Sequence, residues 1–171
     1  MSRTRIHIAR ITAPAWYVAA AWLLLALFAQ VRLLHPFHIR FVEPSLVLVA
    51  VAWYAVRVQP WLAAAYGCAA GICEDLLAYH TGGAWTISTG IVALVCSMLS
   101  RGFFADSIPL LSTIAFAATL ARQLIFWVVM GFEGYPSGLG MMHFREALLE
   151  AVLNAVAITL VMWVARRFSE R

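Results

Sequence analysis

The chain has 171 residues, of which 64% are hydrophobic and 12% are charged, and its mean hydropathy is +0.87. Soluble domains are about 45–50% apolar and about 25% charged, and a globule this small has too much surface to bury such an apolar excess. The excess must therefore face lipid, which excludes an ordinary soluble domain. The net charge of +4 does not indicate nucleic-acid binding, because the arginines are scattered and form no continuous stripe.

Six apolar segments follow one another along the chain. They cover about residues 14–34, 44–58, 61–79, 84–100, 108–132 and 144–168. Their apolar residues run on without alternation, which favours helices over strands, and a helix satisfies its own backbone groups in hydrocarbon. A spanning helix needs roughly 20 residues, so the second segment is short, and Pro44 suits its first helical position. We expect one all-α integral membrane domain with six transmembrane helices, the first of them longer than a signal-peptide core and therefore retained.

The positions of the arginines predict the orientation, because cytoplasmic loops of membrane proteins carry the basic excess. With six spans both chain ends share one side, and that side collects eight arginines against three on the other. The eight are Arg3, Arg5, Arg10, Arg57, Arg101, Arg166, Arg167 and Arg171, and the three are Arg32, Arg40 and Arg145. Both termini are therefore expected in the cytoplasm.

Small residues and a carboxylate share one face of the third segment. Gly67, Gly71 and Asp75 recur every four residues, so they lie above one another on a helix. A Gly-x-x-x-Gly seam lets another helix approach closely, and Asp75 therefore lies along a packed surface. We expect these three residues to serve helix packing.

A polar stripe and a buried cation face each other in the fifth and sixth segments. Glu146, Glu150 and Asn154 recur every four residues, and Arg122 lies deep in the fifth segment at a similar level. Ionisable groups at bilayer depth usually face the bundle interior. We predict that Arg122 bonds to Glu150 or Asn154, with Asp75 as a further candidate, in an interhelical clamp; a proton relay is the alternative interpretation of the stripe.

Catalytic and metal-binding patterns are weak throughout the sequence. His143-x-x-Glu146 places two ligand types together, but a zinc site needs three or four, and the other histidines lie elsewhere. The sequence carries no HExxH, GxSxG or phosphate-loop motif. We therefore expect no enzymatic activity, no cofactor and no metal.

The third and fourth segments carry a resemblance to a known family. A glycine-rich helix ends in Asp75-Leu-Leu, and a short turn with Gly82 and Gly83 leads to the next helix. Together with Pro44 before the short second span and the basic end at residues 166–167, this layout resembles the rod-shape-determining MreD family over essentially the whole chain. One departure concerns the proline, where the family has an acidic residue after it and this chain has Ser45.

The resemblance implies a noncatalytic membrane subunit of the bacterial elongation machinery, with a role in peptidoglycan synthesis and rod shape. The implied partners are the bitopic protein MreC, with RodA, a class B penicillin-binding protein and MreB as further members of the complex. The implied location is the inner membrane, and the implied fold is similar to the six-helix substrate-binding components of energy-coupling-factor vitamin transporters.

The loop between the fifth and sixth segments is the candidate surface for a partner. It runs from Glu133 to Met142, is rich in glycine and ends in two methionines, whose flexible side chains suit adaptable contacts. We take Tyr135, Met141 and Met142 as hypothetical partner contacts, and we expect foreign helices to pack on faces with small residues.

Two other function classes stay open at this point. A substrate-binding component of a small-molecule (vitamin) transporter would show a sizeable outward cavity lined by Glu146, Glu150 and Trp85, because ligand pockets are concave. An intramembrane enzyme is disfavoured, since no nucleophile is paired with a base.

Overall fold

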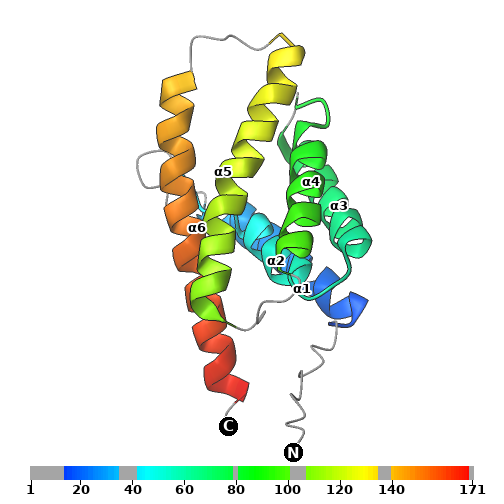
Figure 1. Ribbon diagram of the computed structural model, residues 1–171, viewed down its shortest axis with the longest axis vertical. Coiled ribbons are helices and arrows are strands. Elements are labelled where there is room, and N and C mark those ends of the chain that lie inside the picture. The colour runs from blue at the N-terminus through cyan, green and yellow to red at the C-terminus, as the bar shows by residue number, and fades with distance from the viewer. Residues whose placement is uncertain (1–13, 35–41, 79–80, 101–106, 135–139, 170–171) are drawn as a thin grey trace, which may run out of the picture.

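The described part of the chain folds into a bundle of six α-helices in the computed structural model (Figure 1), which describes residues 14–34, 42–78, 81–100, 107–134 and 140–169. The helices are α1 (Trp16–Ala29), α2 (Leu46–Ala55), α3 (Pro60–Ala78), α4 (Ala84–Leu99), α5 (Ile108–Phe132) and α6 (Gly140–Ser169), and a short π-helical turn, η1 (Gln30–Leu34), extends α1. Each predicted segment overlaps one of these helices. The all-α prediction is therefore confirmed for the described residues.

The start of α2 differs from the sequence prediction. Ser45 is the N-cap, and its side-chain oxygen accepts a hydrogen bond from the Leu48 amide at 3.2 Å. Pro44 therefore precedes the cap instead of occupying the first helical position, because serine oxygens satisfy the free amides of a helix start better than most residues.

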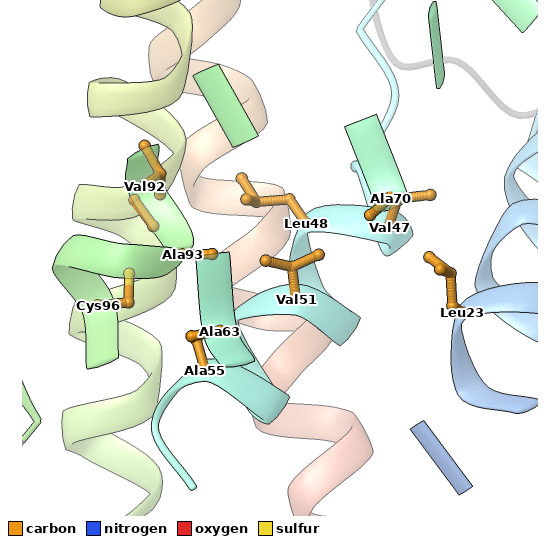
Figure 2. Packing of buried hydrophobic residues seen from close by; sticks show 11 residues of the cluster. Leu23, Val47, Leu48, Val51, Ala55, Ala63, Ala70, Val92, Ala93 and Cys96 are labelled. Carbon is orange, nitrogen blue, oxygen red and sulfur yellow. The ribbon is translucent and has the colours of Figure 1, made fainter. Parts of the chain in front are cut away.

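The short helix α2 lies at the centre of the bundle. All but two of its ten residues are buried, and it packs against α1, α3, α4, α5 and α6. Figure 2 shows Leu48, Val51 and Ala55 of α2 in the cluster that they form with residues of α1, α3 and α4. Another face of α2 packs in a second cluster with α5 and α6. Both halves of the bundle thus share one small helix as their core.

Helices α3 and α4 form a tightly packed hairpin. A Cβ atom on Gly67 would lie 2.6 Å from the Ala93 Cβ, and one on Gly71 would lie 2.5 Å from the Trp85 carbonyl oxygen. On α4, a Cβ atom on Gly90 would lie 2.5 Å from the Cys68 sulfur. The Gly67–Gly71 seam is therefore filled by the next helix of the same chain, and it is not a face that is free for a foreign helix.

Three helices of the described residues are long and apolar enough to cross a bilayer, namely Pro60–Ala78, Ile108–Phe132 and Met142–Arg167. The shorter apolar helices are Trp16–Arg32, Leu46–Ala55 and Ala84–Leu99. At about 1.5 Å per residue, the ten residues of α2 extend about 15 Å, or half of a hydrocarbon core of about 30 Å. Six crossings therefore stay a prediction.

We predict that Gly71→Ala destabilises the bundle by about 1–3 kcal/mol, because the new methyl group would meet α4 backbone that cannot move aside. The matched control is Gly131→Ala, since a Cβ atom on this α5 glycine meets nothing within 4 Å. Thermal unfolding in mild detergent measures both. Equal melting temperatures for the two variants would contradict the close packing described for α3 and α4.

Candidate functional site

The centre of the site is the guanidinium of Arg122, which is only 2% exposed in the middle of the bundle. Its Nη2 donates a hydrogen bond to Oε1 of Glu74 on α3 at 2.9 Å, and its Nη1 donates one to Oγ of Ser45 at 2.9 Å. Glu74 is only 7% exposed. This buried ion pair therefore ties α5 to α3 and to the N-terminus of α2.

An aromatic pair covers the same guanidinium. Cζ of Arg122 lies 4.3 Å from the centroid of the Trp85 ring, close enough for a cation–π interaction. Trp85 in turn stacks on Phe126, with ring centroids 4.0 Å apart and an angle of 25° between the planes. Because Trp85 lies in the first turn of α4, the charge on Arg122 holds four helices together.

The predicted partners of Arg122 are wrong in this structure. Its two hydrogen bonds go to Glu74 and Ser45 instead of Glu150, Asn154 or Asp75. A helical position turns by about 100° from the one before it, so Glu74 and its neighbour Asp75 point in clearly different directions. Glu74 faces the core and pairs with the guanidinium of Arg122, whereas Asp75 bonds to the start of helix α4.

Asp75 caps helix α4 from outside that helix. The N-cap of α4 is Gly83, which has a positive φ of 92° and no side chain to offer. Oδ1 of Asp75 accepts from the Trp85 amide at 3.1 Å, and Oδ2 accepts from the Thr86 amide at 2.9 Å. The hydroxyls of Thr81 and Thr86 also donate to this carboxylate, at 2.7 and 2.6 Å. Asp75 thus replaces the missing N-cap side chain.

The polar stripe of α6 bonds to α5 at two levels. Glu150 accepts a hydrogen bond from the Gln123 side-chain amide, and Nδ2 of Asn154 donates to the Thr119 hydroxyl at 3.0 Å. Nearer the start of α6, Glu146 lies 3.1 Å from Nδ1 of His143. The stripe therefore joins α6 to α5, and it does so without contacting the guanidinium through a hydrogen bond.

Two adjoining cavities open beside this polar network. The first, about 280 Å³ in volume, reaches from Gln30 and Leu77 to the buried pair of Arg122 and Glu74. The second, about 190 Å³, is lined among others by Trp127, whose ring is tilted by 36° against the His143 ring with the centroids 3.7 Å apart. Both cavities share three lining residues, Glu43, Gln123 and Glu150. The polar groups are thus reached by a hollow at one end of the bundle.

Sequence reasoning assigned no role to Glu74 or Ser45, and it named Trp85 only in the lining of an outward cavity. The useful signal for Ser45 is its position before an apolar run, which is typical of an N-cap. For Glu74, the useful signal is that two adjacent carboxylates on a helix cannot share a face, so one of them must have a different partner. No sequence signal brings Trp85 to Arg122, since that contact depends on how α4 crosses α5.

The hypothetical partner contacts fall mostly outside the described residues. Tyr135 lies outside the residues that the structure describes, and so does the side chain of Met141, a residue of the first turn of α6. Met142 is described and is 57% exposed at the start of α6. Among the described residues, no group of three or more His, Cys, Asp or Glu side chains could hold a metal ion.

Comparison with known proteins gives one match. The family model described as rod shape-determining protein MreD matches residues 10–168, which include all described helices except the last residue of α6. No curated protein and no solved structure matches the chain. The likeness to energy-coupling-factor components therefore stays a prediction.

We predict that Arg122→Leu lowers the stability of the bundle by about 3–5 kcal/mol, because Glu74 would be left buried without its counter-ion. Thermal unfolding in mild detergent is the measurement. The double variant Arg122→Leu with Glu74→Leu should recover a large part of the loss, since it removes the stranded charge. A double variant no more stable than Arg122→Leu alone would contradict the pairing.

We also predict a graded loss of stability at Asp75. Asp75→Ala removes the acceptors of the Trp85 and Thr86 amides, and the loss of such a cap costs about 0.5–2 kcal/mol. Asp75→Asn keeps one oxygen and should lie between the wild type and the alanine variant. Chemical unfolding followed by circular dichroism measures the order, and an Asp75→Ala variant as stable as the wild type would contradict the capping role.

Proposed function

The chain belongs to the MreD family of rod shape-determining proteins, and we propose that it is a noncatalytic scaffold of the bacterial cell-elongation complex that binds MreC. The family match over residues 10–168 carries this proposal. With its apolar helices, the chain is an inner-membrane protein with a role in cell shape. We propose the binding of MreC, the scaffold mechanism and the orientation of the chain in the membrane.

The use of the polar residues supports a scaffold. Arg122, Glu74 and Asp75 hold helices of the same chain together through the bonds described above. They leave large apolar side chains on the outside of the bundle, as expected for a protein that meets lipid and other membrane helices. Rod-complex assembly is the role that such a rigid core with an apolar exterior would serve.

A groove on the outside suits the transmembrane helix of a bitopic partner. It has a volume of about 350 Å³, lies between α1, α2 and α6, and contains the small residues Ala26, Ala29 and Ala50 beside Trp22 and Trp53. Small residues let helix backbones approach closely. The glycine seam on α3 is occupied by α4, whereas this groove is open. We propose that the transmembrane helix of MreC binds in this groove.

We also propose an orientation of the chain in the membrane and further partners. The chain crosses the membrane six times with both termini in the cytoplasm, as the excess of arginines on that side favours. RodA, a class B penicillin-binding protein and MreB are further members of the assembly. In Figure 1 the beginning of α1 and the end of α6 lie toward the same end of the bundle, which fits an even number of crossings.

One observation favours a second candidate function. The cavities beside Trp85, Glu146 and Glu150 are the hollow that a substrate-binding component of a vitamin transporter would need. Purification of the chain from membranes in mild detergent separates the candidates. Recovery of MreC supports the scaffold, and recovery of an ATPase module with a bound vitamin supports the transporter.

We predict that a photocrosslinking residue at Met142 captures MreC in living cells. The matched control is Met98, a methionine of α4 with a similar exposed fraction, 54% against 57%, and it should not capture MreC. Mass spectrometry of the crosslinked product gives the identity of the partner.

Two failures of this experiment have different meanings. If MreC is co-purified but crosslinks equally at both positions, the proposed contact near the α5–α6 loop is wrong. If MreC is neither co-purified nor crosslinked when both proteins are present in the membrane, the scaffold proposal itself is wrong.

A further inference from the structure

Another open groove lies on the outside of the bundle, between helix α3 and the end of α1 with its π-helical turn η1. It has a volume of about 390 Å³, and one charged side chain, that of Arg32, lines it among the described residues. Its apolar lining consists of Leu27, Phe28 and Val31 on one side and Cys73, Leu76 and Leu77 on the other. We infer that this α1–α3 groove binds one phospholipid with an anionic headgroup, which goes beyond the proposed scaffold function.

The groove lies between two helices that are bonded to each other at another level. The hydroxyl of Tyr66 on α3 donates a hydrogen bond to the carbonyl oxygen of Ala19 on α1 at 2.8 Å. About two helical turns further along each helix, at Leu27 and Cys73, the space between them is the groove. There α1 passes into η1 (Gln30–Leu34), and π-helical turns are frequent at functional sites. The position of the groove is therefore set by the backbones of two connected helices.

Arg32 gives the groove its positive charge. Its side chain is exposed, and it takes part in none of the ion pairs that join two described residues. The residues that follow η1, 35–41, include no Asp or Glu. A guanidinium keeps its proton and can bind a phosphate through two parallel hydrogen bonds. An apolar groove with one such cation is complementary to a molecule that joins a hydrocarbon chain to a phosphate.

The side chains of the groove favour a lipid over a protein helix. Membrane helices approach each other closely at small residues, as α4 does at Gly67 and Gly71. Among the residues that line the α1–α3 groove, only Cys73 is small, whereas Phe28 and Leu76 are large and are 59% and 76% exposed. Such side chains keep a helix backbone at a distance. A flexible acyl chain can lie between them.

The α1–α3 groove also adjoins the larger of the two cavities beside the buried ion pair. Leu27, Val31 and Leu77 line both the groove and this cavity. The cavity is lined as well by Gln30, whose Oε1 accepts a hydrogen bond from the Val47 amide at 3.2 Å. A lipid in the groove therefore has hydrocarbon contacts along its chain and polar side chains nearby for its headgroup.

The test uses the full-length chain in mild detergent and two lipids with the same dioleoyl chains. Phosphatidylglycerol has a net negative charge, whereas the phosphate of phosphatidylcholine is balanced by an ammonium group. Lipid titration followed by native mass spectrometry measures the affinity of the first bound lipid. We expect phosphatidylglycerol to bind about tenfold more tightly, the size of effect that one charge-assisted hydrogen bond gives. Equal affinities would overturn the inference.

A charge-removing variant locates the headgroup. Arg32→Gln should abolish the preference for phosphatidylglycerol, because the side chain keeps hydrogen-bond donors but loses its charge. The matched control is Arg145→Gln, at an exposed arginine near the start of α6 that does not line the groove, and it should keep the preference. A preference that survives Arg32→Gln, or that both variants lose equally, would overturn the inference.

A groove-filling variant locates the acyl chain. Cys73→Phe places a larger side chain in the groove and should weaken the binding of both lipids about tenfold. The matched control, Ile72→Phe, adds the same side chain at an exposed position of α3 that does not line the groove, and it should bind both lipids as the wild type does. Thermal unfolding shows whether each variant is folded. Unchanged lipid binding by folded Cys73→Phe would overturn the inference.

The chain purified together with MreC distinguishes a lipid from a partner helix in this groove. If the groove is a lipid site, phosphatidylglycerol stays bound in the complex and its binding still depends on Arg32. If MreC displaces the lipid, the groove is a helix-binding surface and the inference is wrong. Failure of the lipid site leaves the scaffold proposal standing, since that proposal is tested by the recovery of MreC itself.

Discussion

A guanidinium in the middle of an apolar bundle sets the arrangement of the helices around it. Arg122 cannot lose its proton in practice, so the fold must supply a counter-ion and hydrogen-bond acceptors at its depth. Glu74 supplies the counter-ion from α3, Ser45 an acceptor at the start of α2, and Trp85 an aromatic face from α4. Because removal of one partner strands the other in a low dielectric, these four helices are held in one relative position.

Two polar residues, Ser45 and Asp75, fix the start of the short central helix and the tight hairpin. Ser45 both caps α2 and accepts from Arg122, so the start of α2 is fixed at the level of the ion pair. In the hairpin, Gly71 lets α4 approach until the carboxylate of Asp75 reaches the free amides of α4. The turn that joins the two helices ends in Gly83, which cannot cap α4 itself. Packing and capping therefore depend on each other.

For function, the arrangement separates an internal polar network from an apolar exterior. The network fixes the helices, and the exterior, with its groove beside Trp22 and Trp53, stays available to lipid and to partner helices. Where the network reaches the hollow that contains Glu150, polar side chains of α5 and α6 line the cavities. A shape-determining membrane protein of the MreD family thus combines a rigid core with two surfaces of opposite chemistry.

The sequence by itself determined the membrane class, the positions of the six helices and the family, since composition and long apolar runs are local properties of the chain. It also indicated that Gly67, Gly71 and Asp75 share a packed face. It did not determine which carboxylate neutralises Arg122, and the expected bonds to Glu150 or Asn154 are replaced by one to Glu74. That choice belongs to the tertiary structure, because depth along a helix axis can be counted from the sequence, whereas the crossing angles and rotations that bring two side chains within hydrogen-bond distance depend on all the helices packed together.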